Sequence, residues 1–364
     1  MKITKIDCQL LHVPTDPPRA SPTEQKAGRL NHIVYVVVNV HTDENVTGTG
    51  YAYQLQSSGR ALLATLEDDL VPLMLEEDPL NHQRLAAKAY ARLQSVGRLG
   101  LVQQAYSALD LAFWDIKGKV ANLPLHKLLG GARDSSPVYA SHTGWLWMTV
   151  DEILEASEPF LEQGFSGIKV KVGLDPFDDG PRLDRIRNAL GEDVWLGADA
   201  NQRYSYVDAL AIGSWLEENV YIDWLEEPIS CEDVEGHHRL ASKLHVPIAC
   251  GEMLFSPIEF QQYLNVGAMG IAQPDITRLG GITGFLKVAH LADQAGVPVA
   301  PHLQPEVAVH LACGLPQVSI VEYMPWTYPL LNDPPKIENG QMVPPDKPGL
   351  GLEWNEQALN RYRK

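Results

Sequence analysis

Features that mark several other classes of protein are scarce or missing in this chain of 364 residues. Its four cysteines (Cys8, Cys231, Cys250 and Cys313) have neither the density of a disulfide scaffold nor the spacing of a metal site. There is no run of about 18 apolar residues, and the N-terminal stretch is too polar for a signal peptide. Basic residues are few as well, with 29 lysines and arginines against 46 acidic residues and a formal net charge of −17. These absences predict a cytoplasmic protein that binds neither nucleic acid nor a membrane.

The patterns that are present divide the chain into regions of different periodicity. Residues 1–125 mix strand patterns such as NHIVYVVVNVHT with helical patterns, which predicts an α+β capping domain. In residues 126–330, eight apolar strand patterns alternate with helical ones, which predicts an α/β fold built as a (β/α) barrel of the TIM type. The turn-rich residues 331–364 are expected to return to the capping domain. Between the first two strands, the polar stretch Pro14–Arg29 is either a surface loop or a lid over an active site.

Ionisable residues recur at the ends of the predicted barrel strands. In GIKVKV, Lys169 and Lys171 alternate with Ile and Val and therefore share one face. The later strand patterns continue the series with Asp199, Glu226, Glu252, Asp275, His302 and Glu322. The successive intervals from Lys171 are 28, 27, 26, 23, 27 and 20 residues, the length of one βα repeat. One such residue alone would be an ordinary solvated rim residue, but the whole series at matching phase predicts an active site at the C-terminal mouth of the barrel.

Three members of this series are carboxylates that can act together as hard oxygen ligands: Asp199, Glu226 and Glu252. No Cys or His occupies a matching position, so the set suits Mg²⁺, or alternatively Mn²⁺. Taken alone, the strand ends EEP and CGEM are explained equally well as ordinary strand-end carboxylates.

The other members of the series suggest chemistry on a proton. A cation beside Lys171 would lower its pKa and allow it to act as a base. Asp275 can hold one nitrogen of His302 and raise the basicity of the other, although such a pair can also be purely structural. A base on each side of a metal-bound anion is the arrangement needed to remove a proton next to a carboxylate. Lys169, and Glu322 if protonated, would then stabilise the resulting enediolate.

These residues resemble the motifs of the enolase superfamily, mandelate racemase subgroup. The matching stretches are KVK (Lys169–Lys171), DAN (Asp199–Asn201), WLEEP (Trp224–Pro228), GE (Gly251–Glu252), PDITRLGG (Pro274–Gly281), HLQPE (His302–Glu306) and VEY (Val321–Tyr323), together with SVGRLG and ALDLAFWDIKGK in the predicted capping domain. The resemblance implies Mg²⁺ on the carboxylate triad, Lys171 and the His302–Asp275 pair as bases on opposite faces of the substrate, and a homo-oligomer. It also implies that Pro14–Arg29 and AYQLQSSGR are specificity loops, and that the substrate is bound by Ser141, Lys169, Asn201 and Glu322.

Within the subgroup, SVGRLG, DVEGHHRLA and GEML are most similar to the acid-sugar dehydratases that act on galactarate and talarate. This implies loss of water from a small hydroxy-carboxylate to give a 2-keto-3-deoxy acid. The polar residues of Pro14–Arg29 favour such an acid: Arg19, Glu24, Lys26 and Arg29. Trp145 and Trp147 would count against a long polar diacid if either faced the pocket. The alternatives are a racemase or epimerase of a 2-hydroxy acid, a Schiff-base aldolase, which the carboxylate triad disfavours, and a non-catalytic binding protein, which would not need the full polar series.

Overall fold

The first part of the chain forms a three-stranded antiparallel sheet in the order β1-β2-β3. The computed structural model describes residues 1–15 and 31–364. Its sheet consists of β1 (Ile3–Pro14), β2 (His32–Thr42) and β3 (Thr47–Leu55), as the strand patterns predict. The helical segments that follow are α2 (Gly59–Ala64), a π-helical stretch (Thr65–Leu70), α3 (Val71–Met74), a 3₁₀ turn (Pro79–Asn81), α4 (His82–Arg92) and α5 (Leu101–Ala121).

Both faces of this sheet are covered, which explains why β2 is apolar at nearly every position. Val34, Val36 and Val38 pack on the side of the capping helices, whereas Tyr35 and Val37 belong to the core shared with the barrel. On the helix side, β3 approaches α5 so closely that a side chain at Gly50 would lie 2.2 Å from the carbonyl oxygen of Ala108. The alternation therefore aims one row of side chains from the capping sheet at the barrel.

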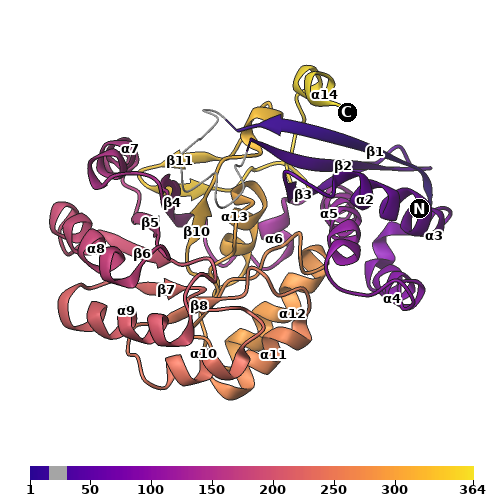
Figure 1. Ribbon diagram of the computed structural model, residues 1–364. Coiled ribbons are helices and arrows are strands. Elements are labelled where there is room, and N and C mark those ends of the chain that lie inside the picture. The colour runs from indigo at the N-terminus through magenta and orange to yellow at the C-terminus, as the bar shows by residue number, and fades with distance from the viewer. Residues whose placement is uncertain (16–30) are drawn as a thin grey trace.

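The second part of the chain is a parallel barrel surrounded by helices (Figure 1). Its strands are β4 (Ser136–Gly144), β5 (Gly167–Lys171), β6 (Trp195–Asp199), β7 (Trp224–Glu226), β8 (Ile248–Cys250), β9 (Ile271–Ala272) and β10 (Val321–Tyr323). Its helices are α6 (Leu125–Leu128), α7 (Val150–Glu162), α8 (Pro176–Leu190), α9 (Tyr206–Asn219), α10 (Val234–Ala241), α11 (Pro257–Val266), α12 (Gly281–Gln294) and α13 (Pro305–Gly314). Pairing of β10 with β4 closes the circle.

The predicted seventh barrel strand, VPVAPHLQ, differs from the expectation. Instead of a continuous strand it contributes isolated bridges, in which Val299 pairs with Ala272 and Val318, and His302 pairs with Asp275. Pro298 and Pro301 flank Val299 and have no N–H to donate, so a continuous ladder cannot form here. The segment still occupies its place in the barrel between β9 and β10.

The C-terminal segment contacts both parts of the molecule. It contains a 3₁₀ turn (Tyr328–Leu330), β11 (Lys336–Glu338), β12 (Gln341–Val343) and α14 (Glu356–Tyr362). The hairpin β11–β12 pairs with the start of β4. Farther along, Nε1 of Trp354 donates to Thr49, and Arg363 bridges to Leu11 of β1. In Figure 1 the yellow α14 accordingly lies beside the indigo capping sheet.

Across residues 1–15 and 31–364, the helices are all too short or too polar to cross a bilayer.

Candidate active site

Strand register places three of the predicted site residues next to one another. Lys171 pairs with Asp199 across β5 and β6, and Asp199 pairs with Glu226 across β6 and β7. Glu252 follows β8, the next strand in the barrel. Because neighbouring strands are about 4.8 Å apart, the side chains at one level of the barrel must converge. Residues that are one βα repeat apart in the sequence thus lie next to one another in the structure.

The carboxylates of Asp199, Glu226 and Glu252 are buried, and each offers one oxygen within 4.8 Å of the others. Burial and the neighbouring charge of Asp199 raise the pKa of Glu226 well above its usual range. Within the described chain, Oε2 of Glu252 is buried and accepts no hydrogen bond. Three crowded carboxylates, one of them with an oxygen that accepts no hydrogen bond, fit a hard divalent cation, which would relieve their mutual repulsion.

Lys169 is almost completely buried, with a side-chain exposure of 1%. Its Nζ lies 2.6 Å from Oε1 of Glu226, 2.8 Å from Oε1 of Glu322 and 3.5 Å from Oδ2 of Asp199. Burial lowers the pKa of Lys169, but Glu226 and Glu322 outweigh it and hold that pKa well above its usual value. Lys169 is therefore a fixed positive charge rather than a proton carrier.

Lys169 lowers the pKa of Lys171, as predicted for a neighbouring cation, but a carboxylate outweighs this effect. Its Nζ is in direct contact with Oδ2 of Asp199. Burial and Lys169 lower the pKa of Lys171, but the carboxylate of Asp199 raises it, and the net direction is upward. The register that brings Lys171 to the site also pairs it with an anion, and that anion is one of the candidate metal ligands.

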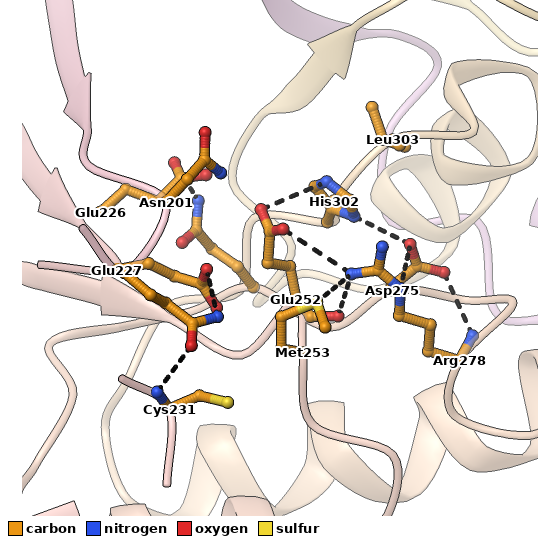
Figure 2. Close-up of polar contacts among 12 residues, drawn as sticks. Asn201, Glu226, Glu227, Cys231, Glu252, Met253, Asp275, Arg278, His302 and Leu303 are labelled. Carbon is orange, nitrogen blue, oxygen red and sulfur yellow. Dashed lines mark hydrogen bonds and ion pairs between the residues drawn. The ribbon is translucent and has the colours of Figure 1, made fainter. Parts of the chain in front are cut away.

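His302 lies between two carboxylates (Figure 2). Its Nδ1 is 2.8 Å from Oδ2 of Asp275, and its Nε2 is 3.3 Å from Oε2 of Glu252. Burial would raise the pKa of Asp275, but Arg278 and the hydrogen bond to His302 keep it well below its usual range. The ionised Asp275 thus accepts a hydrogen bond from Nδ1–H of His302, and Nε2 of His302 faces Glu252 of the carboxylate triad.

Glu322 does not meet the condition of being protonated under which it could donate to the enediolate. Burial would raise its pKa, but Lys169, His302 and the hydroxyl of Ser141 lower it to about 2. Its Oε2 accepts from the backbone N–H of Leu303 at 2.8 Å. Glu322 is therefore an ionised acceptor that orders the chain beside His302. The side chain of Asn201, in contrast, is exposed at the end of β6.

Several side chains around the site carried no predicted role. Gln273 donates to Oε2 of Glu226 at 2.6 Å, and Nη1 of Arg278 donates to the carbonyl oxygen of Glu252 at 2.5 Å. Arg278 lies within the motif PDITRLGG. The motif alone does not indicate that its side chain contacts both Glu252 and Asp275, which follow different strands. Residues with positive φ also gather after the barrel strands: Asn201, Gln202, Glu227, Leu303 and Gln304. Such backbone conformations are concentrated at functional sites, and of these five residues only Asn201 is of a type enriched at positive φ.

The two predicted specificity loops are described to different extents. Apart from Pro14 and Thr15, the lid stretch lies outside the described residues, including Arg19, Glu24, Lys26 and Arg29. In the second loop, Oε1 of Gln56 accepts from the backbone N–H of Asn31 at 2.8 Å.

The tryptophans of GWLWM stack on each other. The ring centroids of Trp145 and Trp147 lie 4.9 Å apart at an interplanar angle of 13°. Nε1 of Trp145 donates to the carbonyl oxygen of His142 at 2.7 Å. Arg182 donates to the carbonyl oxygens of both Trp145 and Lys171, and this joins the tryptophan loop to the end of β5.

Family comparisons agree with this geometry. Residues 152–358 match the family described as enolase C-terminal domain-like, and residues 7–130 match the mandelate racemase/muconate lactonizing enzyme N-terminal domain. The chain therefore belongs to the enolase superfamily, and its N-terminal domain is of the mandelate racemase/muconate lactonizing enzyme type.

Relatives of this family member include proteins named as dehydratases. The L-talarate/galactarate dehydratase of Salmonella typhimurium is 37% identical over 330 residues, which are 90% of this chain and 82% of that protein. The arabinonate dehydratase of Saccharolobus solfataricus is 32% identical over 342 residues, 90% of each chain. A crystal structure of the Salmonella enzyme liganded with Mg and L-lyxarohydroxamate has a TM-score of 0.94, at 35% identity, and the match covers 100% of this chain and 93% of that one. The buried triad of the present family member fits a Mg²⁺ site of this kind.

Proposed function

We propose that this chain is a Mg²⁺-dependent dehydratase of acid sugars, which converts an aldarate or aldonate into a 2-keto-3-deoxy acid. One observation carries the proposal. Lys171 and His302 contact different members of one carboxylate triad, Lys171 at Asp199 and His302 at Glu252. They come from separate parts of the barrel, with β4 and β10 between them. Two proton-transfer groups on two sides of an anion-binding centre suit removal of a proton next to a carboxylate.

The metal site is Asp199, Glu226 and Glu252. When bound there, Mg²⁺ would draw electron density from the substrate carboxylate and make the neighbouring C–H more acidic. The charge of Asp199, which raises the pKa of Lys171, would then also be compensated, and this would allow Lys171 to lose its proton and act as a base. Lys169 supplies a second fixed positive charge in the same buried cluster. Because its pKa is held high, it stays charged while negative charge develops on the substrate.

The proposed reaction uses one proton-transfer group for each bond that breaks. Lys171 removes the α-proton, and the electron pair of that C–H bond moves toward the carboxylate to give an enediolate. These electrons then form the double bond between the α- and β-carbons as the bond to the β-hydroxyl breaks, and His302 supplies the proton with which that hydroxyl leaves as water. The resulting enol rearranges to the 2-keto-3-deoxy acid. Asp275 supports this role because it holds Nδ1 of His302 and leaves Nε2 to exchange the proton.

The relatives named as talarate/galactarate and arabinonate dehydratases support the choice of dehydration over racemisation. The test is incubation of the Mg²⁺-loaded protein with a panel of aldarates and aldonates, followed by detection of 2-keto acids and by NMR of the products. We expect a 2-keto-3-deoxy acid from at least one substrate. If the only product is the epimer of the 2-hydroxy acid, the chain is a racemase and the proposal is wrong. Covalent trapping of Lys171 by borohydride would instead indicate a Schiff-base aldolase.

The proposed setting is the cytoplasm, and all four cysteines are unpaired as that setting requires. A homo-oligomer remains part of the proposal, and measurement of the mass in solution tests it.

A further inference from the structure

The capping sheet delivers one hydroxyl group to the proton-transfer pair of the barrel. The Oη atom of Tyr53, on β3, donates a hydrogen bond of 2.8 Å to Oδ2 of Asp275. The same oxygen lies 2.8 Å from Nδ1 of His302. Tyr53 and Asp275 are 222 residues apart in the chain, and both are buried. A residue of the capping domain thus contacts the atom that orients the imidazole.

The carboxylate of Asp275 is held at both oxygens. Oδ1 accepts from the backbone N–H and the hydroxyl of Thr277, each at 2.8 Å. Around Oδ2, Tyr53 and His302 are the near partners, whereas Nε2 of Gln304 lies at 3.4 Å and Nε of Arg278 at 3.8 Å. Tyr53 is therefore the closest donor to Oδ2 apart from the imidazole itself.

We propose that Tyr53 is a positioning residue that fixes Asp275, and through it the ring of His302, so that the capping domain completes the proton-transfer pair. This inference about Tyr53 rests on the proposed function only in taking His302 as the acid. Tyr53 donates to Asp275 and not to the imidazole, so its effect passes through the carboxylate. Without the hydroxyl, Oδ2 loses a short donor, and the carboxylate can turn about its terminal torsion.

The chain provides a matched control for this hydroxyl. Tyr35 on β2 is the direct cross-strand partner of Tyr53, and it is likewise buried on the barrel side of the sheet. Its hydroxyl, however, lies 3.4 Å from the hydroxyl of Thr327 and not against Asp275. Tyr35→Phe therefore removes an equivalent atom from the same sheet while leaving the Asp275–His302 pair intact.

The experiment compares Tyr53→Phe with Tyr35→Phe in the full-length Mg²⁺-loaded protein. For Tyr53→Phe we expect kcat for 2-keto acid formation to fall by roughly 10- to 100-fold, as for other partners that orient a functional group, with KM nearly unchanged. Exchange of the substrate α-proton with solvent deuterium, which depends on Lys171, should persist. Tyr35→Phe should keep kcat within about 2-fold. In the Asp275→Asn background, Tyr53→Phe should add little further loss.

A spectroscopic readout separates this inference from the proposed function. In protein labelled with ¹⁵N-histidine, the Nδ1–H signal of His302 is assigned by its loss in His302→Asn. We expect Tyr53→Phe to move this signal and Tyr35→Phe to leave it in place. If both variants leave it in place and keep kcat, Tyr53 does not position the pair and the inference is overturned. If the wild type dehydrates no acid sugar but Tyr53→Phe still moves the signal, the proposed function fails and the positioning role stands.

Discussion

Nε2 of His302 lies 3.3 Å from Oε2 of Glu252, so the imidazole assigned to proton transfer touches a carboxylate assigned to the metal. Removal of the charge of Glu252 should therefore lower the affinity for the metal ion, because Glu252 is one of its three proposed ligands. The side chains are both nearly buried, which excludes the solvent that would otherwise screen their interaction.

Glu252→Gln should weaken Mg²⁺ binding by roughly 10-fold or more, because a neutral amide replaces one of three anionic ligands. Isothermal titration of the metal-free variant with MgCl₂ measures the loss. Glu306→Gln is the control, since Glu306 is also buried but accepts a hydrogen bond from Tyr51 outside the triad. Equal affinities in wild type and Glu252→Gln would refute the metal assignment. Full activity in EDTA would refute it as well.

Lys169→Met should lower the free energy of unfolding by about 3–5 kcal/mol in EDTA, because it leaves Glu226 and Glu322 buried without their cation. The loss of stability should be smaller in Mg²⁺, because the bound ion would also neutralise part of the negative charge of the triad. Urea unfolding in both buffers measures the difference. Lys127→Met, which breaks only an exposed pair with Asp134, should change stability little in either buffer. A Lys169→Met protein as stable in EDTA as the wild type would contradict the role of Lys169 as a fixed charge.

His302→Asn should reduce 2-keto acid formation by about 10²–10⁴-fold, because the β-hydroxyl is a poor leaving group without a proton donor. Exchange of the substrate α-proton in D₂O should continue, since Lys171 is unchanged. Proton NMR of the recovered substrate measures exchange, and a 2-keto acid assay measures turnover. Lys171→Met is the control and should stop both reactions. Loss of exchange in His302→Asn would show that His302, and not Lys171, removes the α-proton.

His310 should make the folded state less stable as the pH falls. It is buried on α13, where Nδ1 accepts from the backbone N–H of His126 and Nε2 donates to the carbonyl oxygen of Leu350. Burial lowers its pKa from 6.5 to about 3. Below pH 6.5 the unfolded chain therefore takes up a proton that the folded chain does not. Stability relative to His310→Gln should fall by about 1.4 kcal/mol per pH unit from pH 6.5 toward pH 3, measured by urea unfolding. A constant difference across this range would contradict the neutral buried imidazole.

Asp110 should show the opposite dependence. It accepts from the backbone N–H and the hydroxyl of Thr283 at the start of α12, and thereby joins the capping helix α5 to the barrel. Burial raises its pKa to about 7 from 3.8. Between these values the folded state binds the extra proton, so the stability of the wild type relative to Asp110→Asn should increase as the pH falls from 7 toward 4. The same urea series measures it, and a decrease would show that Asp110 stays ionised.

The strand ends of the barrel were predictable because parallel strands repeat at a nearly constant interval and bring equivalent positions to one mouth. That rule located the triad, the lysines and His302 without any knowledge of contacts. The repeat interval did not reveal that Lys171 pairs directly with Asp199, because the interval between strands does not determine which residues of neighbouring strands lie opposite each other. For the same reason, the upward direction of the Lys171 pKa was not foreseen.

The parts that sequence reasoning missed depend on contacts between distant segments. Tyr53 belongs to an antiparallel sheet and Asp275 to the barrel, and no periodicity relates a residue of one to a residue of the other. The replacement of the seventh strand by isolated bridges was in principle visible, since Pro298 and Pro301 cannot donate to a ladder. The continuous apolar run VPVAP nevertheless predicted a strand.

Strand β4 pairs with β5 and β10 inside the barrel and with β12 of the C-terminal hairpin, while Arg363 returns to Leu11 at the capping sheet. In the gene, the segment that completes the capping region is therefore separated from it by the whole barrel. A recombination event that carried only the first part of the gene into another chain would leave Leu11 without its bridge. One that ended the barrel before residue 341 would leave the start of β4 without its hairpin partner.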